Sequence, residues 1–596
     1  MSSGGWSGGA GGAGAAGGNA GASGGGHGGG GGGPSAFPQK YAKRARMNEE
    51  AMQYYAAALC GLMFLFVFIH LTRLFSQKTG LNKATIFAPF HYTSRILRRR
   101  LLPRFPGLPS RGHAVLAVLF ISINLVVSFV HMDNNNLGIQ TNLAARWGWL
   151  AVANMVVAVF LSLKNTPLAY ISAWSYERVN VMHKIVGSVT MVAVILHACT
   201  YASYFGTSGN VKRLREHEEI FGIVSGFCML ALVFAAVVIR RFMYELFYVM
   251  HVLFFLATVV FVGLHQPEVA KRILIVTCIV GGLWVFDRSI RFLRLVFYSF
   301  NNEATVYPLP DGGTRIVLRK GPSGQVSGSH CFVWIPGVRF FEMHPFTIVS
   351  SKSHEFVVAS HDGFTRDLHS FATAHPGRKV MASVEGPYGT FPNLTSFDRV
   401  IMFAGGSGAS FTVGMALNSM ESREGKKPIE FHWMVRHRGY FSWFADFIQT
   451  LSGSNKVNVK LHVTGNTPPS SSDGPKPFIS TPHRSTSPID IDLEDSDIEK
   501  VRSGPSTPSH AENITPCLGN CGAHQICLSS GLEITEGRPD VGKLIRAEVA
   551  KAERTERILI MGCGPPSLMD DVRNATAACI ECEGPAIELH CEQFGW

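Results

Sequence analysis

The fold of this chain is decided by two apolar segments, VMHKIVGSVTMVAVILHACTY (residues 181–201) and YVMHVLFFLATVVFVGLHQ (residues 248–266). The first carries His183 and His197, and the second repeats the same fourteen-residue interval with His251 and His265. On an α-helix, fourteen residues fall about 40° short of four turns and rise roughly 21 Å, most of a hydrocarbon core about 30 Å thick. Each segment is therefore predicted to be a membrane helix with both imidazoles on one face.

Two such helices facing each other would hold the four imidazoles as two stacked pairs, one near each membrane surface. This arrangement suits two haems, each ligated by histidine from both sides. A single membrane histidine more often hydrogen-bonds to a neighbouring helix or belongs to a proton path. His70 and His131 lack a partner at this interval and are interpreted as structural or interfacial. The doubled interval favours haem ligation by the other four.

The composition averages over unlike parts of the 596-residue chain. The formal net charge of +12 would suit a nucleic-acid partner, but much of the basic excess lies beside apolar spans, where it reports membrane orientation instead. Residues 1–50 open with a glycine-rich run that cannot bury a core, which predicts a disordered tail. Among twelve scattered cysteines, Cys517, Cys521 and Cys527 lack a second pair at zinc spacing, so free thiols are expected.

Seven candidate membrane spans make up residues 51–298, with the haem core at about 145–265. They lie near residues 51–75, 113–132, 145–163, 181–203, 219–240, 243–264 and 272–298. The connection 76–112 carries eight basic residues and no acidic one, so it should be cytosolic. The N-terminus is then outside, despite a smaller basic patch of its own. By this topology, His183 and His251 lie near the inner membrane surface, while His197 and His265 lie near the outer one.

The second half of the chain has the pattern of a soluble protein. Residues 299–395 contain short alternating runs separated by DGG and GPSG turns, which predict antiparallel strands in a small barrel. The five runs are ATVYPL, TRIVLRK, HCFVWIP, FTIVSS and FVVASH. Residues 396–596 alternate strands with helices, which predicts a parallel sheet of the nucleotide-binding type. Within this part, residues 466–515 are rich in Ser, Thr and Pro and include the acidic run IDIDLEDSDIE, so a disordered insertion is expected.

One predicted barrel strand begins with His344-Pro345-Phe346-Thr347. After four histidines on two membrane helices, this segment resembles the flavin signature of the ferric reductase and NADPH oxidase superfamily, over about residues 145–596. The resemblance implies an all-α haem-binding bundle followed by a ferredoxin-reductase-like module, with a β-barrel FAD domain and an α/β NAD(P) domain. It places Phe346 against the isoalloxazine, Thr347 near N5 and His344 toward the phosphate or ribose. It also places a second segment, Gly363-Phe364-Thr365, at the pyrophosphate.

The glycine cluster Gly405-Gly406-Ser407-Gly408 follows a predicted strand and opens a predicted helix. Glycines there let a pyrophosphate approach backbone N–H groups at a helix N-terminus, although ordinary turns use such clusters too. The resemblance assigns this loop to NAD(P)H. Arg436 and Arg438 follow the next strand, where a guanidinium could pair with a 2′-phosphate; this favours NADPH over NADH, with a solvated basic loop as the alternative.

The segment Cys563-Gly564-Pro565 follows another apolar strand, RILIMG. It resembles the superfamily's CGP motif, which places the cysteine beside the nicotinamide; a buried structural thiol is the alternative. The sequence closes on EQFGW, and flavin reductases of this superfold often finish with an aromatic residue that covers the flavin ring. Trp596 or Phe594 is the candidate for that role, against simple packing. The expected catalytic residues are therefore Cys563, Thr347 and Trp596.

The resemblance implies a transmembrane reductase of ferric or cupric chelates, closest to the fungal type. Electrons would pass from cytosolic NADPH through FAD and two b-type haems to metal across the membrane, for iron uptake. Expected partners are the chelates, the bilayer and an iron permease or oxidase, but no nucleic acid. The plasma membrane is expected, with a vacuolar or endosomal membrane as the alternative. The rival functions are a superoxide-generating NADPH oxidase, which usually has six spans, and an ion channel or transporter with a nucleotide-sensing domain.

Overall fold

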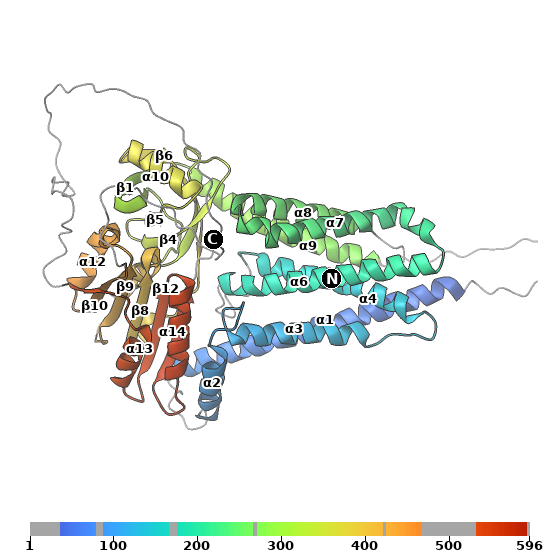
Figure 1. The fold of residues 1–596 in the computed structure, drawn as a ribbon, viewed down its shortest axis with the longest axis horizontal. Helices are drawn as coiled ribbons and strands as arrows, with labels where there is room; N and C mark the ends of the chain where they lie inside the picture. Colours follow the sequence, from blue (N-terminus) through green and yellow to red (C-terminus); the bar gives the residue numbers. More distant parts are fainter. Residues whose placement is uncertain are drawn as a thin grey trace, which may run out of the picture.

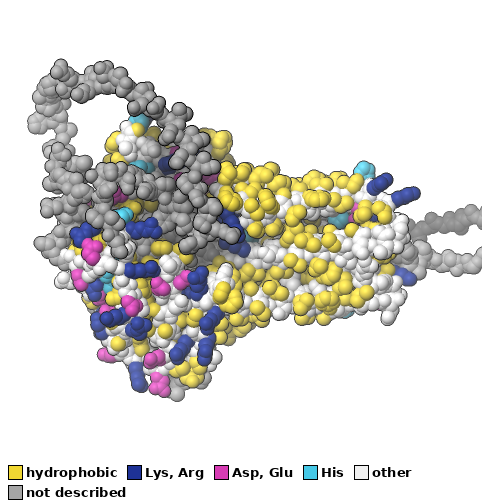
Figure 2. Space-filling model, in the orientation of Figure 1, with side chains coloured by type: hydrophobic (Ala, Val, Ile, Leu, Met, Phe, Trp, Pro, Cys, Tyr) yellow, Lys and Arg dark blue, Asp and Glu magenta, His cyan; other side chains and the backbone are white. Residues whose placement is uncertain are grey.

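The computed structural model describes residues 36–78, 88–165, 176–265, 271–420, 423, 425–465 and 532–592. It consists of a rod of long helices and, at one end of the rod, a module of two β-sheets with their own helices (Figure 1). Hydrophobic side chains dominate the surface of the rod, whereas charged side chains gather on the module (Figure 2). This distribution is expected of a chain whose first part faces lipid and whose second part faces water, because lipid favours apolar side chains and water favours charged ones.

Seven of the described helices are long and apolar enough to cross a membrane. They are α1 (Ala36–Lys78), α3 (Arg111–Phe129), α4 (Ile139–Ser162), α6 (Tyr176–Thr207), α7 (His217–Val237), α8 (Tyr244–Leu264) and α9 (Lys271–Ser299). A short basic helix, α2 (Ala88–Leu101), lies between the first two. Helices are required here because a lipid-exposed segment must hydrogen-bond all of its backbone groups internally. The predicted all-α membrane part is confirmed.

Helix α1 corrects the predicted end of the N-terminal tail. The tail was expected to lack structure through residue 50, but α1 begins at Ala36. The glycine run stops before this point, and residues 36–50 (AFPQKYAKRARMNEE) contain no glycine and many good helix formers. The first membrane helix therefore extends back through the basic patch, where Lys43 forms an ion pair with Asp133.

A buried polar network fixes α1 and α3 against α4. The Tyr55 hydroxyl donates to Asn154 Oδ1 (2.6 Å), and the Asn154 amide donates to Asn124 Oδ1 (2.7 Å). The fully buried Arg146 donates to Asn48 Oδ1 (2.7 Å) and to backbone carbonyls at the end of α3. Because an unpaired polar group is costly in an apolar environment, these bonds specify which helix faces pack together.

The first part of the module is a curled antiparallel sheet of seven strands in the order β6-β1-β2-β5-β4-β3-β7. The elements are β1 (Glu303–Leu309), β2 (Gly313–Leu318), β3 (His330–Trp334), β4 (His344–Ser350), β5 (Glu355–Ala359), α10 (Phe364–Ala374), β6 (Arg378–Met381) and β7 (Ser383–Tyr388). Side chains from most of these strands and from α10 meet in one apolar core. The five strands predicted from alternating runs are all present, and β4 carries the HPFT segment.

The second part is a parallel sheet of six strands in the order β11-β10-β9-β8-β12-β13. The elements are β8 (Arg399–Gly405), α11 (Ala409–Met420), β9 (Ile429–Val435), α12 (Ala445–Ser452), β10 (Val457–Val463), β11 (Glu533–Glu536), α13 (Val541–Ala550), β12 (Arg557–Cys563), α14 (Pro566–Cys579) and β13 (Ala586–Glu592). The strand order reverses between β8 and β12, and such a switch point is where open α/β sheets bind nucleotides. The predicted fold class is confirmed.

A buried ion pair and a more exposed one join the rod to the module. Arg291, near the end of α9, pairs with the fully buried Glu385 of β7 at 3.1 Å, and Ser383 donates to the carbonyl of Leu295. Arg339, between β3 and β4, pairs with Glu245 in the first turn of α8 at 3.1 Å. The module is thus attached at the end of the rod where α8 begins and α9 ends (Figure 1).

Candidate functional site

The four histidines lie as two facing pairs between α6 and the α8 segment. The ring centroids of His183 and His251 are 6.3 Å apart with an angle of 71° between their planes. Those of His197 and His265 are 6.2 Å apart with an angle of 74°. His265 is not inside α8, as the sequence predicted, but is the residue that caps its C-terminus. The pairing across helices is nevertheless the one that the repeated interval predicts.

A backbone carbonyl holds one nitrogen of each imidazole. His183 Nδ1 donates to the carbonyl of Ala158, His197 Nδ1 donates to that of Ala144, and His265 Nδ1 donates to that of Glu218, each at 2.8 Å. For His251 the carbonyl of Leu232 lies at 3.4 Å. Because a carbonyl only accepts, these bonds place a ring proton on Nδ1, so that the neutral imidazole has its lone pair on Nε2, as in a metal-binding histidine.

Two glycines make room for the rings of His197 and His265. A Cβ on Gly148 of α4 would lie 2.7 Å from the His197 ring, and one on Gly222 of α7 would lie 2.6 Å from His265 Nδ1. Neither distance is compatible with any side chain larger than hydrogen. The neighbouring helices therefore press directly against both imidazoles and fix how they are oriented.

The ring spacing fits an iron held between two imidazoles. With a metal–nitrogen distance of roughly 2.0 Å and each ring centre about 1.2 Å behind its nitrogen, the centres would be about 6.4 Å apart. Both pairs lie within 0.2 Å of that value, at 6.3 and 6.2 Å. Two neutral imidazoles with free Nε2 atoms are also a suitable donor set for haem iron.

The predicted flavin residues gather around the start of β4. The ring of His344 stacks on that of Phe364 with centroids 4.5 Å apart and planes at 18°, and Phe346 lies 6.2 Å from Phe364. Pro345 separates the two rings along the strand, and the Thr347 side chain is largely buried. Phe364 is buried, whereas the half-buried rings of His344 and Phe346 offer an apolar surface of the kind that an isoalloxazine or adenine ring covers.

The second predicted flavin segment begins α10. Gly363 has a φ of +74°, a conformation that favours glycine, and it directly precedes Phe364 at the first position of the helix. The Thr365 hydroxyl accepts a hydrogen bond from the backbone N–H of His361 at 2.8 Å. The backbone N–H groups of a helix's first turn favour an anion. The Glu245 carboxylate lies at this helix end, 2.7 Å from where a Cβ on Gly363 would be.

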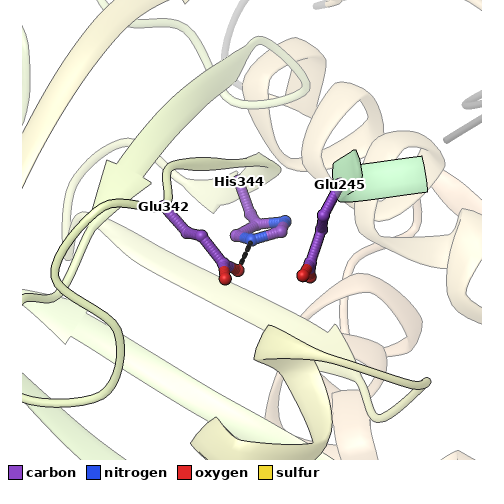
Figure 3. Close-up of side chains that lie close together, drawn as sticks. All are labelled: Glu245, Glu342 and His344. Carbon is purple, nitrogen blue, oxygen red and sulfur yellow. Dashed lines mark hydrogen bonds and ion pairs between the residues drawn. The ribbon is translucent and has the colours of Figure 1, made fainter. Parts of the chain in front are cut away.

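Two carboxylates lie beside His344 (Figure 3). Glu245 of α8, Glu342 and His344 have potential ligand atoms within 4.8 Å of one another. Arg339, however, pairs with both carboxylates, at 3.1 and 2.7 Å, and with Asp367 at 2.8 Å. Hydrogen bonds to Glu342 and Asp367 raise the pKa of Arg339 above its usual value, so it stays a cation. The cluster is therefore an ion-pair network around Arg339 rather than a site for a second cation.

The two nucleotide loops pack against each other at the switch point of the parallel sheet. Gly405 ends β8, and Gly406, Ser407 and Gly408 form a single tight turn before α11. A Cβ on Gly408 would lie 2.3 Å from the carbonyl oxygen of Cys563, and one on Gly405 would lie 2.6 Å from Pro565. A Cβ on Gly564 would lie 3.0 Å from the backbone nitrogen and Cα of Gly405. The glycines are therefore needed for loop-to-loop packing as well as for any approach of a pyrophosphate.

Cys563 lies at the carboxyl end of β12 and is buried. Burial raises the pKa of its thiol well above the usual value, and the nearby Glu592 acts in the same direction. The side chain is thus a neutral thiol, which suits contact with a nicotinamide better than nucleophilic attack. Glu592 itself lies 2.9 Å from His590, whose ring stacks on Phe411. Sequence reasoning missed this pair because nothing in AIELHCEQ distinguishes it from an ordinary strand.

The structure does not test the roles predicted for the remaining site residues. Arg438 is exposed and pairs with Glu536, so its guanidinium has a partner within the protein; Arg436 follows β9 at the same edge of the sheet. Trp596, Phe594, the insertion 466–515 and the three cysteines Cys517, Cys521 and Cys527 lie outside the described residues. The roles assigned to all of these residues stay predictions.

Three protein-family models match the chain. "Ferric reductase like transmembrane component" matches residues 147–262, "FAD-binding domain" matches residues 300–391 and "Ferric reductase NAD binding domain" matches residues 397–577. The first match spans both histidines of α6 and the inner one of α8. The other two correspond to the antiparallel and the parallel sheets.

Curated relatives match along most of the chain. A probable ferric reductase transmembrane component of Candida albicans is 25% identical over 512 residues, which cover 83% of this chain and 72% of the relative. Ferric/cupric reductase transmembrane component 2 of Saccharomyces cerevisiae is 25% identical over 538 residues, or 87% of this chain and 70% of the relative. Among solved structures, phthalate dioxygenase reductase aligns with 49% of this chain and 68% of its own, at 15% identity and a TM-score of 0.29.

Proposed function

Because the chain belongs to the ferric reductase family of membrane oxidoreductases, we propose that it reduces ferric or cupric chelates on one side of a membrane with electrons from NADPH on the other. One turnover is NADPH plus two Fe(III) giving NADP⁺, one proton and two Fe(II). The membrane proposed is the plasma membrane, where reduction would prepare iron for uptake by a permease or an oxidase–permease pair. The names of the relatives support the choice of metal substrates.

The single observation that carries this proposal is that the four imidazoles face each other as two pairs. His183 with His251 and His197 with His265 would each hold one b-type haem through Nε2. Haems held there would relay single electrons between the membrane faces, and an FAD on the module would accept the hydride of NADPH and release its electrons singly. Two imidazoles on each iron leave no coordination position for oxygen, so the arrangement favours outer-sphere transfer to a chelate.

In the proposed reaction, different residues of the module would bind NADPH and the flavin. The loop Gly405–Gly408 would present backbone N–H groups to the pyrophosphate of NADPH, and Arg436 would pair with the 2′-phosphate. Cys563 would contact the nicotinamide, while Phe346 and Thr347 would face the flavin ring. Trp596 would cover the flavin until nicotinamide replaces it. The two nucleotide loops directly follow the adjacent strands β8 and β12, so both parts of the proposed NADPH site are held at one edge of the parallel sheet.

The attachment of the module supports the proposed direction of electron flow. Glu245, which pairs with Arg339 of the module, precedes His251 by six residues on α8, and Arg291 pairs with Glu385 at the same end of the rod. His183 and His251 therefore form the inner pair, and His197 and His265 form the outer pair. Electrons from the module would enter at the inner pair and leave at the outer one.

The test is an anaerobic titration of the purified full-length protein with NADPH. We expect a low-spin b-type spectrum that is reduced by NADPH and reoxidised by ferric citrate, with two Fe(II) formed per NADPH. Alanine at His251 should halve the haem content and stop electron flow. A protein without haem bands would contradict the proposal and favour a channel or transporter. Superoxide formation in air without chelate reduction would favour an NADPH oxidase.

A further inference from the structure

The short helix α2 lies between two membrane helices and beside the module. The membrane span of α1 ends at Thr72 and that of α3 begins at Arg111, so α2 lies on the side where both helices leave the bilayer. Figure 1 shows α2 next to α14, at the end of the rod that carries the module, running across the direction of the rod. A helix with this position and direction would lie along the membrane surface rather than through it.

One face of α2 is attached to the module. The Arg95 guanidinium donates to two carbonyls of the loop between α14 and β13, at 2.9 and 2.6 Å. Just beyond the end of α2, Leu102 packs against the apolar core of the parallel sheet, and Arg104 pairs with Asp570 of α14 at 2.7 Å. Helix α2 and the residues that follow it are therefore held against the module by hydrogen bonds, an ion pair and an apolar contact.

The opposite face of α2 is apolar and uncovered. Tyr92, Ile96 and Leu97 are 53%, 40% and 52% exposed. At about 100° per residue they occupy an arc of roughly 140°, centred almost opposite the less exposed side of Arg95 and Arg98. A surface helix of a soluble protein has the reverse arrangement, with its apolar face toward the protein and its polar face toward water. The orientation of α2 is the one expected where the surroundings are lipid.

The charge of α2 favours the same surroundings. The helix contains no acidic residue, and Arg99 and Arg100 in its last turn are exposed, with no acidic partner among the residues that the structure describes. By the same angles, Arg100 lies within the apolar arc and Arg99 beside it. Arginines at a membrane interface keep their apolar stems against lipid while their guanidiniums reach the phosphates. A bilayer offers an apolar interior and anionic headgroups together, where α1 and α3 leave it, which favours lipid over a protein partner.

We propose that α2 is an interfacial helix whose exposed face binds the membrane surface nearest the module. Tyr92, Ile96 and Leu97 lie among the lipids, and Arg99 and Arg100 bind the headgroups of anionic phospholipids. Because α14 directly follows one of the two nucleotide loops, the contacts of α2 with α14 then hold the nucleotide end of the parallel sheet at the bilayer. The inference concerns the attachment of the module and does not depend on the proposed reductase function.

The test is photocrosslinking of the full-length protein in nanodiscs of phosphatidylcholine mixed with phosphatidylserine. The photoreactive residue p-benzoylphenylalanine is introduced at Tyr92 or at Leu97, and mass spectrometry identifies what it captures. We expect a phospholipid adduct at both positions. Tyr307 of β1 is the matched control, because it is 43% exposed on the part of the module away from the rod (Figure 1) and should capture no lipid. A crosslink to a second copy of the chain, or no more lipid than at Tyr307, would overturn the proposal.

A second comparison tests the charge of the lipid. Relative to pure phosphatidylcholine, phosphatidylserine should raise the yield of the Leu97 adduct by about twofold or more. The double variant Arg99→Gln with Arg100→Gln should lose this increase, whereas Arg99→Lys with Arg100→Lys should keep it. Both arginines are exposed, so these variants should fold as the wild type does. An adduct yield that does not respond to phosphatidylserine would contradict the binding of anionic headgroups by the two arginines.

Discussion

Alanine at Gly222 is a direct test of the outer histidine pair. The added Cβ would lie 2.6 Å from His265 Nδ1, whereas ordinary van der Waals contact begins at 3.4 Å, so the ring would have to move by 0.8 Å. Metal–ligand distances tolerate only about 0.2 Å. The ring cannot rotate away freely because Nδ1 donates to the carbonyl of Glu218, one turn earlier on α7. We therefore expect Gly222→Ala to lose the outer haem and keep the inner one.

The assay is the haem-to-protein ratio, which should fall from two to one, followed by NADPH reduction of the remaining haem. Chelate reduction should fall by tenfold or more. Gly148→Ala should act in the same way through His197, since its Cβ would lie 2.7 Å from that ring. Gly61→Ala on α1, with nothing within 4 Å, is the control. Alanine favours a helix over glycine by about 1 kcal/mol. A loss of haem in these variants therefore cannot be attributed to a weaker helix. Retention of two low-spin haems in Gly222→Ala and Gly148→Ala would refute the reasoning.

Three further predictions concern the module. Gly408→Ala should abolish flavin reduction by NADPH in stopped-flow experiments, because the added Cβ would overlap the carbonyl of Cys563. Dithionite should still reduce the haems of this variant. Unchanged flavin reduction would contradict the loop packing. Arg291→Met leaves the buried Glu385 without its main partner and should lower the free energy of unfolding by about 3–5 kcal/mol, seen as early FAD release on heating; an unchanged release temperature would argue against the junction. Burial lowers the pKa of His432 from 6.5 to about 3, so its contribution to stability is complete above pH 6.5 and is lost as the pH falls toward 3. At pH 5 this loss is about 2 kcal/mol, and His432→Phe should make the melting temperature correspondingly less sensitive to acid, whereas an identical pH dependence would count against it.

The sequence predicted the architecture well because its signals are local. Apolar stretches of membrane length, alternating strands and glycine turns depend only on neighbouring residues, and all seven spans and the five alternating strands were found. The strands β6 and β7 were not predicted, because RKVM is short and SVEGPY contains a Gly-Pro step that breaks the alternation. The start of α1 was placed too late because glycine content dominated the interpretation of the tail.

The site was predictable only in part, for a physical reason. A periodic interval places His183 and His197 on one face, but it does not indicate which carbonyl receives each Nδ1 proton. Those carbonyls belong to α4 and α7, which carry no motif. In the same way, Gly148 and Gly222 are ordinary helix glycines in the sequence and gain meaning only from the rings packed against them. Contacts between elements that are distant in the chain carry this information.

The junction between rod and module is also made of contacts between elements that are distant in the chain. These contacts include ion pairs between charged side chains. In the proposed electron path, the His183–His251 pair would have to stay at a fixed distance from a flavin on β4, because electron transfer weakens steeply as the separation grows. An apolar contact would tolerate sliding, whereas the Arg339 fork holds Glu245 of α8, Glu342 and Asp367 of α10 in one arrangement. The Arg291–Glu385 pair is the buried one at this junction, and buried ion pairs add little net stability but can specify a unique register. The helix that carries His251 and the strand that carries Phe346 are also linked through charged groups, because Glu245 of α8 pairs with Arg339, which precedes β4.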